Sequence, residues 1–333
     1  MSFKVNKLIS GGIMCNYNCS VKCAHCRHNA SPKRESGFIS EAMLDHILQK
    51  LELLGCRSVH LEGGEPFLYP EKLLRAVKQI NRSNISLEHI VTNGSWYQNQ
   101  KNTRILLKKL KENGLRRLLL KVSPFQNENI PLNKVNHVAQ EAEKLGINVM
   151  IWDNEVYPEV ASFDRAKTHS LNQYIKKFGP DYMKKLAECF NVTFAGRTFD
   201  AYEKYLNKYP AASILNNNSN CIDSFPTQHH FHVDLYGNFI FSHTNGVAQH
   251  IDDVGKPIDP RKYPYLSILT NGGIPSLYKL ATQKYGFKPR AEYISKCHLC
   301  YDIRKFLVID QGINSPDLQP LGFYEENQIR ADF

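Results

Sequence analysis

Three cysteines within one short stretch restrict the fold and chemistry of this chain more than any other feature. Cys19, Cys23 and Cys26 follow one another at intervals of four and three residues. At this spacing a single loop can wrap three corners of an iron–sulfur cube and leave the fourth iron without a protein ligand. An iron with a free position can bind a further molecule, as open catalytic metal sites do and closed structural sites do not.

A second motif, Leu61-Glu-Gly-Gly-Glu-Pro66, follows at the end of an apolar stretch. Gly63 and Gly64 permit a close backbone approach that a Cβ atom would block. Glu65 can accept a hydrogen bond from an ammonium group, and Pro66 stiffens the loop without offering a donor. A Gly-Gly turn alone means little, and this one gains weight from its place after a predicted strand and downstream of the cysteines.

Cys-x3-Cys-x2-Cys followed by Gly-Gly-Glu-Pro resembles the radical S-adenosylmethionine (SAM) superfamily, over roughly the first two hundred residues. The resemblance implies a [4Fe–4S] cluster whose open iron chelates the amino and carboxylate groups of SAM. Reduction of the cluster then cleaves SAM to a 5′-deoxyadenosyl radical, which abstracts a hydrogen atom. The loop 63–66 is expected to contact the amino group of SAM.

The resemblance also suggests further cofactor-binding residues. His25 stands where the family usually has an aromatic residue beside the adenine. Thr92 and Asn93 form a polar turn after a predicted strand, near the expected cofactor position. Ser123, at the end of the next strand, is expected to reach the SAM carboxylate or ribose, and Arg197 could pair with a carboxylate.

A structural zinc site is the alternative interpretation of the cysteine loop. Cys15, Cys19, Cys23 and Cys26 would supply four thiolates. Zinc ribbons, however, usually bring together two distant cysteine pairs rather than four thiols of one loop. We therefore favour the iron–sulfur cluster and expect Cys15 to be a bystander at the end of the first strand.

The 333-residue chain has a composition that is ordinary for a globular protein, with 42% apolar and 22% charged residues. It has no apolar run long enough to span a membrane and no signal-peptide core, which predicts a cytoplasmic protein. Its net charge is +10, but the basic residues are dispersed, so nucleic acid is not the expected partner. An acidic electron donor such as flavodoxin or a ferredoxin would benefit from the same charge.

Strands are expected to alternate with helices at intervals of about thirty residues, which favours βαβ units and a parallel sheet. The predicted strands are 5–14, 58–62, 87–91, 117–122, 147–151 and 192–194. With the family resemblance, this predicts a partial (β/α)6 TIM barrel over residues 1–205. Active sites of such barrels lie at the carboxyl ends of the strands, so Asp153 and Glu155 are candidates to face the substrate.

Residues 206–333 are predicted to form a small α+β domain with a hairpin at 231–241. Cys221, Cys297 and Cys300, together with this hairpin, resemble the auxiliary-cluster region (SPASM or twitch type) of larger radical SAM enzymes. The resemblance implies a second [4Fe–4S] cluster whose fourth position is open or held by His243, unless the site has decayed. Cys221 could instead return a hydrogen atom to a substrate radical.

His229, His230 and His232 precede or begin the hairpin, and His230 and His232 would share one face of a strand. A histidine metal site could form there. We favour packed or solvated side chains.

We therefore predict a radical SAM enzyme that abstracts a hydrogen atom from a peptide or protein and so forms a crosslink, a thioether or an epimer. A small-molecule substrate is the alternative, because no peptide-recognition domain precedes the cysteine loop. A more remote alternative is a non-catalytic zinc or iron–sulfur module that contacts nucleic acid.

Overall fold

The computed structural model describes residues 3–152, 154–189, 194–217, 221–222, 225, 229–242 and 244–325. Its centre is a sheet with five parallel strands in the order β5-β4-β3-β2-β1. These strands are β1 (Ser10–Met14), β2 (Ser58–Glu62), β3 (Ser86–Thr92), β4 (Arg117–Lys121) and β5 (Asn148–Trp152). The mixed α/β fold with a parallel sheet confirms the predicted fold class, a partial TIM barrel.

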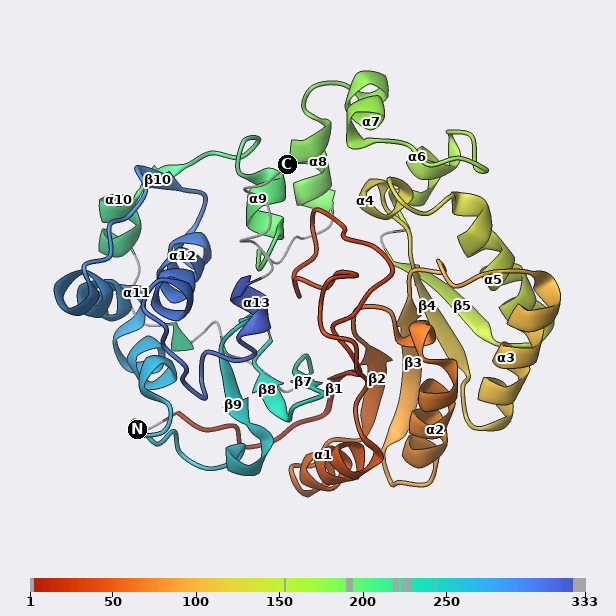
Figure 1. Cartoon of the computed structure of the whole chain (residues 1–333), viewed down its shortest axis with the longest axis horizontal. Coiled ribbons are helices and arrows are strands. Elements are labelled where there is room, and N and C mark those ends of the chain that lie inside the picture. Colours follow the sequence, from red (N-terminus) through yellow and green to blue (C-terminus); the bar gives the residue numbers. More distant parts are fainter. Residues whose placement is uncertain are drawn as a thin grey trace.

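Helices follow the strands as the apolar periodicity predicts. The first, α1 (Glu41–Leu53), begins where the Ser40 side chain accepts a hydrogen bond from the Met43 backbone N–H. Its buried face consists of leucine and isoleucine side chains at helical spacing. The helices α2 (Pro70–Asn81), α3 (Gln100–Glu112) and α5 (Leu132–Lys144) lie along the outer side of strands β2 to β5 (Figure 1).

The predicted C-terminal hairpin is present and extends the same sheet. It consists of β7 (His232–Asp234) and β8 (Asn238–Ile240), and β9 (Ala248–His250) adds a further antiparallel strand. Because β7 pairs in parallel with β1, the sheet continues without interruption into the C-terminal part of the chain. The domain boundary at residues 205 and 206 stays a prediction, and the main sheet contains strands from both sides of it.

The predicted sixth strand falls largely outside the described residues, which do not include Val192 and Thr193, and Phe194 is not in a strand. The element β6 (Tyr209–Pro210) instead pairs antiparallel with β10 (Glu292–Tyr293) in a separate two-stranded sheet. Two helices, α7 (Leu171–Phe178) and α8 (Tyr182–Cys189), precede this segment. Gly179 ends the first of them with a positive φ of 102°, a conformation that glycine adopts readily.

Short helices and one long pair complete the structure: α4 (Pro124–Asn127), α6 (Tyr157–Ala161), α9 (Thr198–Tyr202), α10 (Ala211–Asn216), α11 (Pro264–Tyr285), α12 (Lys296–Ile309), α13 (Gly322–Glu325), and the 3-10 turns η1 (Pro66–Leu68) and η3 (Ile251–Asp253). Figure 1 shows α10, α11 and α12 on the side of the molecule away from β5. Among the described residues, no helix is both long and apolar enough to cross a membrane.

Candidate active site

A cavity of about 370 Å³ lies against the carboxyl ends of the parallel strands and the cysteine loop. The side chains of Cys19, Cys23 and Cys26 line it together. The charges of Cys26 and Cys19 raise the pKa of Cys23 further than burial alone does, which places the three thiols close to one another. Burial also raises the pKa of Cys19, to about 12. Thiols in such surroundings ionise when a cation compensates the charge, as a metal ligand requires.

Cys15 does not share this position. It is fully buried in the protein core at the end of β1, it is not among the residues that line the cavity, and its thiol points to the carbonyl oxygen of Ile13 at 3.8 Å. The structure therefore brings three thiols rather than four to the cavity, and the four-thiolate zinc alternative has no support from this loop.

The buried side chain of Arg197, which precedes α9, holds the cysteine loop in place. Its Nε donates to the carbonyl oxygen of Cys23 at 3.1 Å, and its Nη2 donates to that of Ala30 at 2.6 Å. Its backbone N–H donates to the carbonyl oxygen of Cys26 at 3.2 Å and to Asn29 Oδ1 at 2.8 Å. Arg197 was predicted to pair with a cofactor carboxylate. It does not line the cavity, and its Nε and Nη2 brace the loop, whereas its Nη1 is buried without a hydrogen-bond partner among the described residues. The pairing with a carboxylate stays a prediction.

Gly63 and Gly64 pack directly on the backbone of the cysteine loop. The Gly64 N–H donates to the carbonyl oxygen of Asn16 at 2.8 Å, and the Glu65 N–H donates to that of Asn18 at 3.1 Å. A Cβ atom at Gly63 would overlap Asn16, and one at Gly64 would overlap the carbonyl group of Asn18. Both glycines line the cavity, so the close approach inferred from the sequence is present.

The Glu65 carboxylate is buried and accepts three hydrogen bonds from the protein. Its donors are the backbone N–H of Phe67 at 3.1 Å, the hydroxyl of Thr92 at 2.8 Å and the backbone N–H of Asn93 at 2.8 Å. Burial raises the pKa of Glu65 to about 7 despite these donors. Neither Glu65 nor Pro66 lines the cavity, so the carboxylate joins the loops after β2 and β3. The predicted contact of these two residues with an ammonium group stays a prediction.

The predicted Thr92-Asn93 turn lies at the cavity and contacts the cysteine loop. Asn93 Nδ2 is 3.6 Å from Cys19 Sγ, within the distance of an N–H···S hydrogen bond, and 3.4 Å from Ser20 Oγ. Thr92 accepts from the Trp96 indole N–H at 2.9 Å. Both turn residues line the cavity, as expected for residues near a cofactor.

His25 and Ser123 differ in how they meet the cavity. The His25 ring lines it and stacks on Phe125, with ring centroids 4.2 Å apart. Burial lowers the pKa of His25 to about 3, so the ring is neutral and suited to stacking. The Ser123 hydroxyl donates to the Gln126 side chain and caps α4, and it does not line the cavity. Its predicted contact with SAM stays a prediction.

Several polar side chains of the cavity were not singled out from the sequence. They lie on β2, β3 or β4 or directly after the last cysteine of the loop: Arg27, His28, His60, Glu62, His89 and Lys121. On β2, polar and apolar residues alternate, which was the available sign that one face of a buried strand carries His60 and Glu62. Among the described residues, Arg27 Nε and Nη2 are buried without a hydrogen-bond partner.

The three C-terminal thiols also come together. Cys297 and Cys300 lie near the start of α12, which Ser295 caps. Burial raises the pKa of Cys221 to about 11, and the charges of Cys300 and Cys297 add to the shift, which shows that the three groups are neighbours. His243, the predicted fourth ligand, lies outside the described residues.

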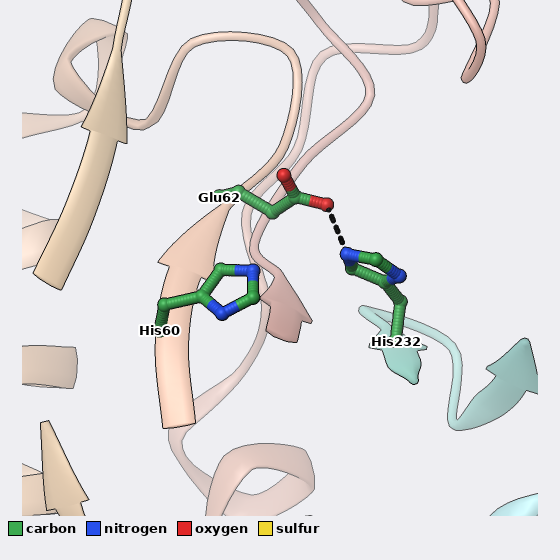
Figure 2. Close-up of side chains that lie close together, drawn as sticks. All are labelled: His60, Glu62 and His232. Atoms are coloured by element: carbon green, nitrogen blue, oxygen red, sulfur yellow. Dashed lines mark ion pairs between the residues drawn. The ribbon is translucent and has the colours of Figure 1, made fainter. Parts of the chain in front are cut away.

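The remaining predicted candidates fall into two groups. Asp153 lies outside the described residues, and Glu155 is exposed and does not line the cavity. The three histidines 229, 230 and 232 all line the cavity. His230 precedes β7 rather than sharing a strand face with His232, because β7 begins at His232. Figure 2 shows the His232 ring facing the side chains of His60 and Glu62.

Comparison with known proteins identifies the domain that forms this site. The family model described as the radical SAM superfamily matches residues 13–151. This stretch begins in β1, ends in β5 and contains the cysteine loop and the Gly63-Gly64 loop. Residues 13–151 are a radical SAM domain. The protein is accordingly an enzyme of the radical SAM class, whose members use a [4Fe–4S] cluster and SAM. No curated protein sequence matches the chain.

Solved structures are similar to the chain only at a distance. Native anSMEcpe with bound AdoMet is 14% identical, with a TM-score of 0.43, over 97% of this chain and 100% of that one. BtrN in complex with AdoMet and 2-DOIA is 14% identical, with a TM-score of 0.39, over 81% and 90%. SuiB of Streptococcus suis bound to S-adenosylmethionine is 16% identical, with a TM-score of 0.36, over 77% and 67%. At these sequence identities and TM-scores, the similarity supports no inference about the function of this chain.

The residues of the cavity fit the cofactors of the radical SAM class. Three thiols converge on one side, and the fourth cysteine nearby faces away, which suits a cluster with one open iron. Arg27 presents buried N–H groups that have no acceptor within the described part of the chain, and a carboxylate is the matching partner. SAM carries such a carboxylate.

Proposed function

We propose that Cys19, Cys23 and Cys26 hold the [4Fe–4S] cluster and that the enzyme acts on a peptide or protein, forming a crosslink, a thioether or an epimer. The observation that carries the assignment of ligands is that these three thiols line one cavity together with Gly63 and Gly64. When bound, the cluster and SAM supply a radical that abstracts a hydrogen atom from an unactivated C–H bond. The protein supplies position and shielding from water.

The chain's own residues would bind SAM as follows. Gly63 and Gly64 would offer backbone groups to its amino group, and His25 would stack on the adenine with its ring already fixed against Phe125. We assign the SAM carboxylate to Arg27, because its unpartnered N–H groups face the cavity, rather than to Ser123, whose hydroxyl is used within α4.

Cys221, Cys297 and Cys300 are proposed to hold a second [4Fe–4S] cluster. Their gathering in the C-terminal part supports this proposal, since auxiliary clusters are bound by cysteine thiolates. An auxiliary-cluster region in a radical SAM enzyme also favours a peptide or protein substrate. The role of Cys221 as a hydrogen-atom donor is the alternative to ligation.

The decisive experiment counts iron and 5′-deoxyadenosine after anaerobic reconstitution with dithionite as reductant. Wild type is compared with a Cys19/Cys23/Cys26→Ala variant and with a Cys221/Cys297/Cys300→Ala variant. We expect about eight irons in wild type, since each cluster holds about four. Either variant should keep about four, and only the first should lose SAM cleavage completely.

Each outcome has a separate meaning. If wild type holds about four irons and only the first variant loses them, the second cluster does not exist but the first assignment stands. If the first variant keeps its iron and its SAM cleavage, the assignment of the ligands is wrong. A zinc-loaded, colourless protein with salt-dependent affinity for nucleic acid would instead favour a non-catalytic binding module.

A small-molecule substrate is the alternative to the peptide. The cavity of about 370 Å³ is favourable to it, because pockets for small ligands begin at about 300 Å³. Candidate peptides encoded near the gene should increase 5′-deoxyadenosine formation above the level without substrate and should carry a mass change. If no such peptide increases 5′-deoxyadenosine formation, but an extract of metabolites smaller than about 1 kDa does, the substrate is a small molecule.

A further inference from the structure

Three metal-binding side chains converge on the cavity wall from two strands that are not direct neighbours. In the sheet, Gly12 of β1 pairs with His60 of β2 on one side and with His232 of β7 on the other. Glu62 lies two residues after His60 and therefore on the same face of β2. The imidazole nitrogens and carboxylate oxygen of His60, Glu62 and His232 lie within 4.8 Å of one another (Figure 2).

Gly12 makes this convergence sterically feasible. A Cβ atom at this position would lie 2.5 Å from His60 Nε2 and 3.0 Å from His232 Nε2. The two imidazoles thus occupy the space above the glycine and direct their Nε2 atoms to the same region. No other residue type would leave that space open, because every other side chain begins with a Cβ atom.

The contact between Glu62 and His232 is close but is not a well-aligned hydrogen bond. His232 Nε2 is 2.8 Å from Glu62 Oε1, yet among the described residues this buried oxygen has no donor with hydrogen-bonding geometry. Two ligands at about 2.1 Å from an ion and at right angles to each other are about 3 Å apart. The spacing therefore suits two atoms that share a cation.

The surroundings also match those of a bound metal. Glu62 is 6% exposed and His232 is 2% exposed, so both are shielded from competition by bulk water. His28 Nε2 approaches Glu62 Oε1 to 3.4 Å from the end of the cysteine loop, and the His89 ring stacks on His60 with centroids 4.8 Å apart. These contacts limit the movement of the Glu62 carboxylate and of the His60 ring.

We propose that His60, Glu62 and His232 bind one divalent first-row transition-metal cation at a site separate from the cysteines. Two histidines and one carboxylate on one side of an ion leave further coordination positions open, and those positions face the cavity. A water molecule or a substrate oxygen or nitrogen atom would fill them. The inference does not rest on the proposed function, because the site contains no thiolate and its occupancy requires neither SAM nor reduction.

Equilibrium dialysis of the anaerobically reconstituted full-length protein against Co2+, without SAM or reductant, tests the proposal. Bound cobalt is counted per chain by mass spectrometry in wild type, Glu62→Gln and His232→Gln. We expect one cobalt that binds at least tenfold more weakly in both variants. Glu62→Gln keeps the shape of the side chain, and the cluster iron and the thermal midpoint without cobalt show whether each variant is folded.

The matched control is His46→Gln. His46 Nε2 lies 2.6 Å from Asp252 Oδ1 on the outside of the molecule, where its side chain is 40% exposed. This variant also removes a histidine beside a carboxylate, and it should bind cobalt as wild type does. A second variant, Gly12→Ala, keeps all three donors but fills the space between the rings, and it should weaken binding as well.

Two results would overturn the proposal. Wild type that takes up no cobalt has no such site. If wild type, Glu62→Gln and His232→Gln take up cobalt equally, the ion binds at another site. A Cys297/Cys300→Ser variant would then show whether thiolates bind it. Neither result would affect the iron count and SAM cleavage on which the proposed function depends.

Discussion

Replacing Arg197 by methionine removes the buried guanidinium that braces the cysteine loop. Two of its N–H groups donate to the carbonyl oxygens of Cys23 and Ala30, at 3.1 and 2.6 Å. Arg197 is completely buried, so water cannot replace these donors without a change of structure. Methionine has a similar length but no donor, and the two carbonyl groups would lose these partners.

The size of the effect follows from these two hydrogen bonds. Each hydrogen bond to a charged group contributes about 1.5–3 kcal/mol. Removal of a buried charge offsets part of the loss, so the free energy of unfolding should fall by about 3 kcal/mol. A chain of this length unfolds with an entropy of about 0.7 kcal/mol per kelvin, so the thermal midpoint should fall by about 4 °C.

The assay measures three quantities in a Cys297/Cys300→Ser background, in which only the N-terminal cluster contributes iron. We expect Arg197→Met to lower the thermal midpoint and the iron content, while chains that hold a cluster bind SAM with unchanged affinity. Arg304→Met is the control. Arg304 is also buried, but it donates to the backbone carbonyl oxygen of Asn245, in the C-terminal part of the chain, at 3.1 Å. It should lower the midpoint and leave the iron in place.

One result would refute this reasoning. If Arg197→Met keeps its midpoint and its iron but binds SAM at least tenfold more weakly, Arg197 contacts a cofactor carboxylate, as the sequence suggested. The brace would then be an incidental contact of the guanidinium.

Three further predictions concern the loops around the cavity. Burial raises the pKa of Glu65 to about 7, so between pH 4.5 and 7 the folded state binds more protons than the unfolded state and stability falls as pH rises. Between pH 6 and pH 8, the free energy of unfolding measured in urea should fall by about 1 kcal/mol more in wild type than in Glu65→Gln. If this free energy depends on pH in the same way in both proteins, the prediction is wrong. Asn93→Ala removes the N–H near Cys19 Sγ and should make the cluster potential more negative in a redox titration followed by EPR; an unchanged potential would contradict the contact. Gly64→Ala should abolish SAM cleavage because its Cβ would meet a backbone carbonyl, whereas Gly37→Ala, with nothing within 4 Å, should be as active as wild type.

The sequence predicted the parallel strands well because their signals are local. The strand β2 was predicted with its observed bounds, Ser58–Glu62, since Gly63 follows its last residue and a helix end precedes its first residue. The helix α1 has equally local signals, because Ser40 is a good N-cap and the apolar residues recur at helical spacing. Such features need no knowledge of distant residues.

Roles that depend on distant partners could not be predicted in the same way. Arg197 lies about 170 residues beyond the carbonyl groups that it binds, and an arginine in a loop gives no sign of being buried. The Glu65 carboxylate accepts hydrogen bonds from Thr92 and Asn93 at the end of the next strand, and the sequence around Glu65 gives no sign of these donors. In both cases the close approach of separate loops decides the role.

The convergence of His60 and His232 depends on the register of the sheet. Alternation along β2 showed that His60 and Glu62 share a face, but the sequence does not reveal that β7 pairs with β1. The hairpin was predicted correctly as a local unit and was assigned to a separate domain. Only the pairing of Gly12 with both histidines places the rings together.

The insertion of β1 between β2 and β7 also has a consequence for how the chain is made. During synthesis β1 can pair with β2 early, but its other edge must wait until residues 232–234 have been translated. At about 5–20 residues per second, this delay is on the order of 10 to 40 seconds. Through that interval the nascent barrel exposes an unpaired strand edge next to the cysteines, where a chaperone or a neighbouring nascent chain can reach it.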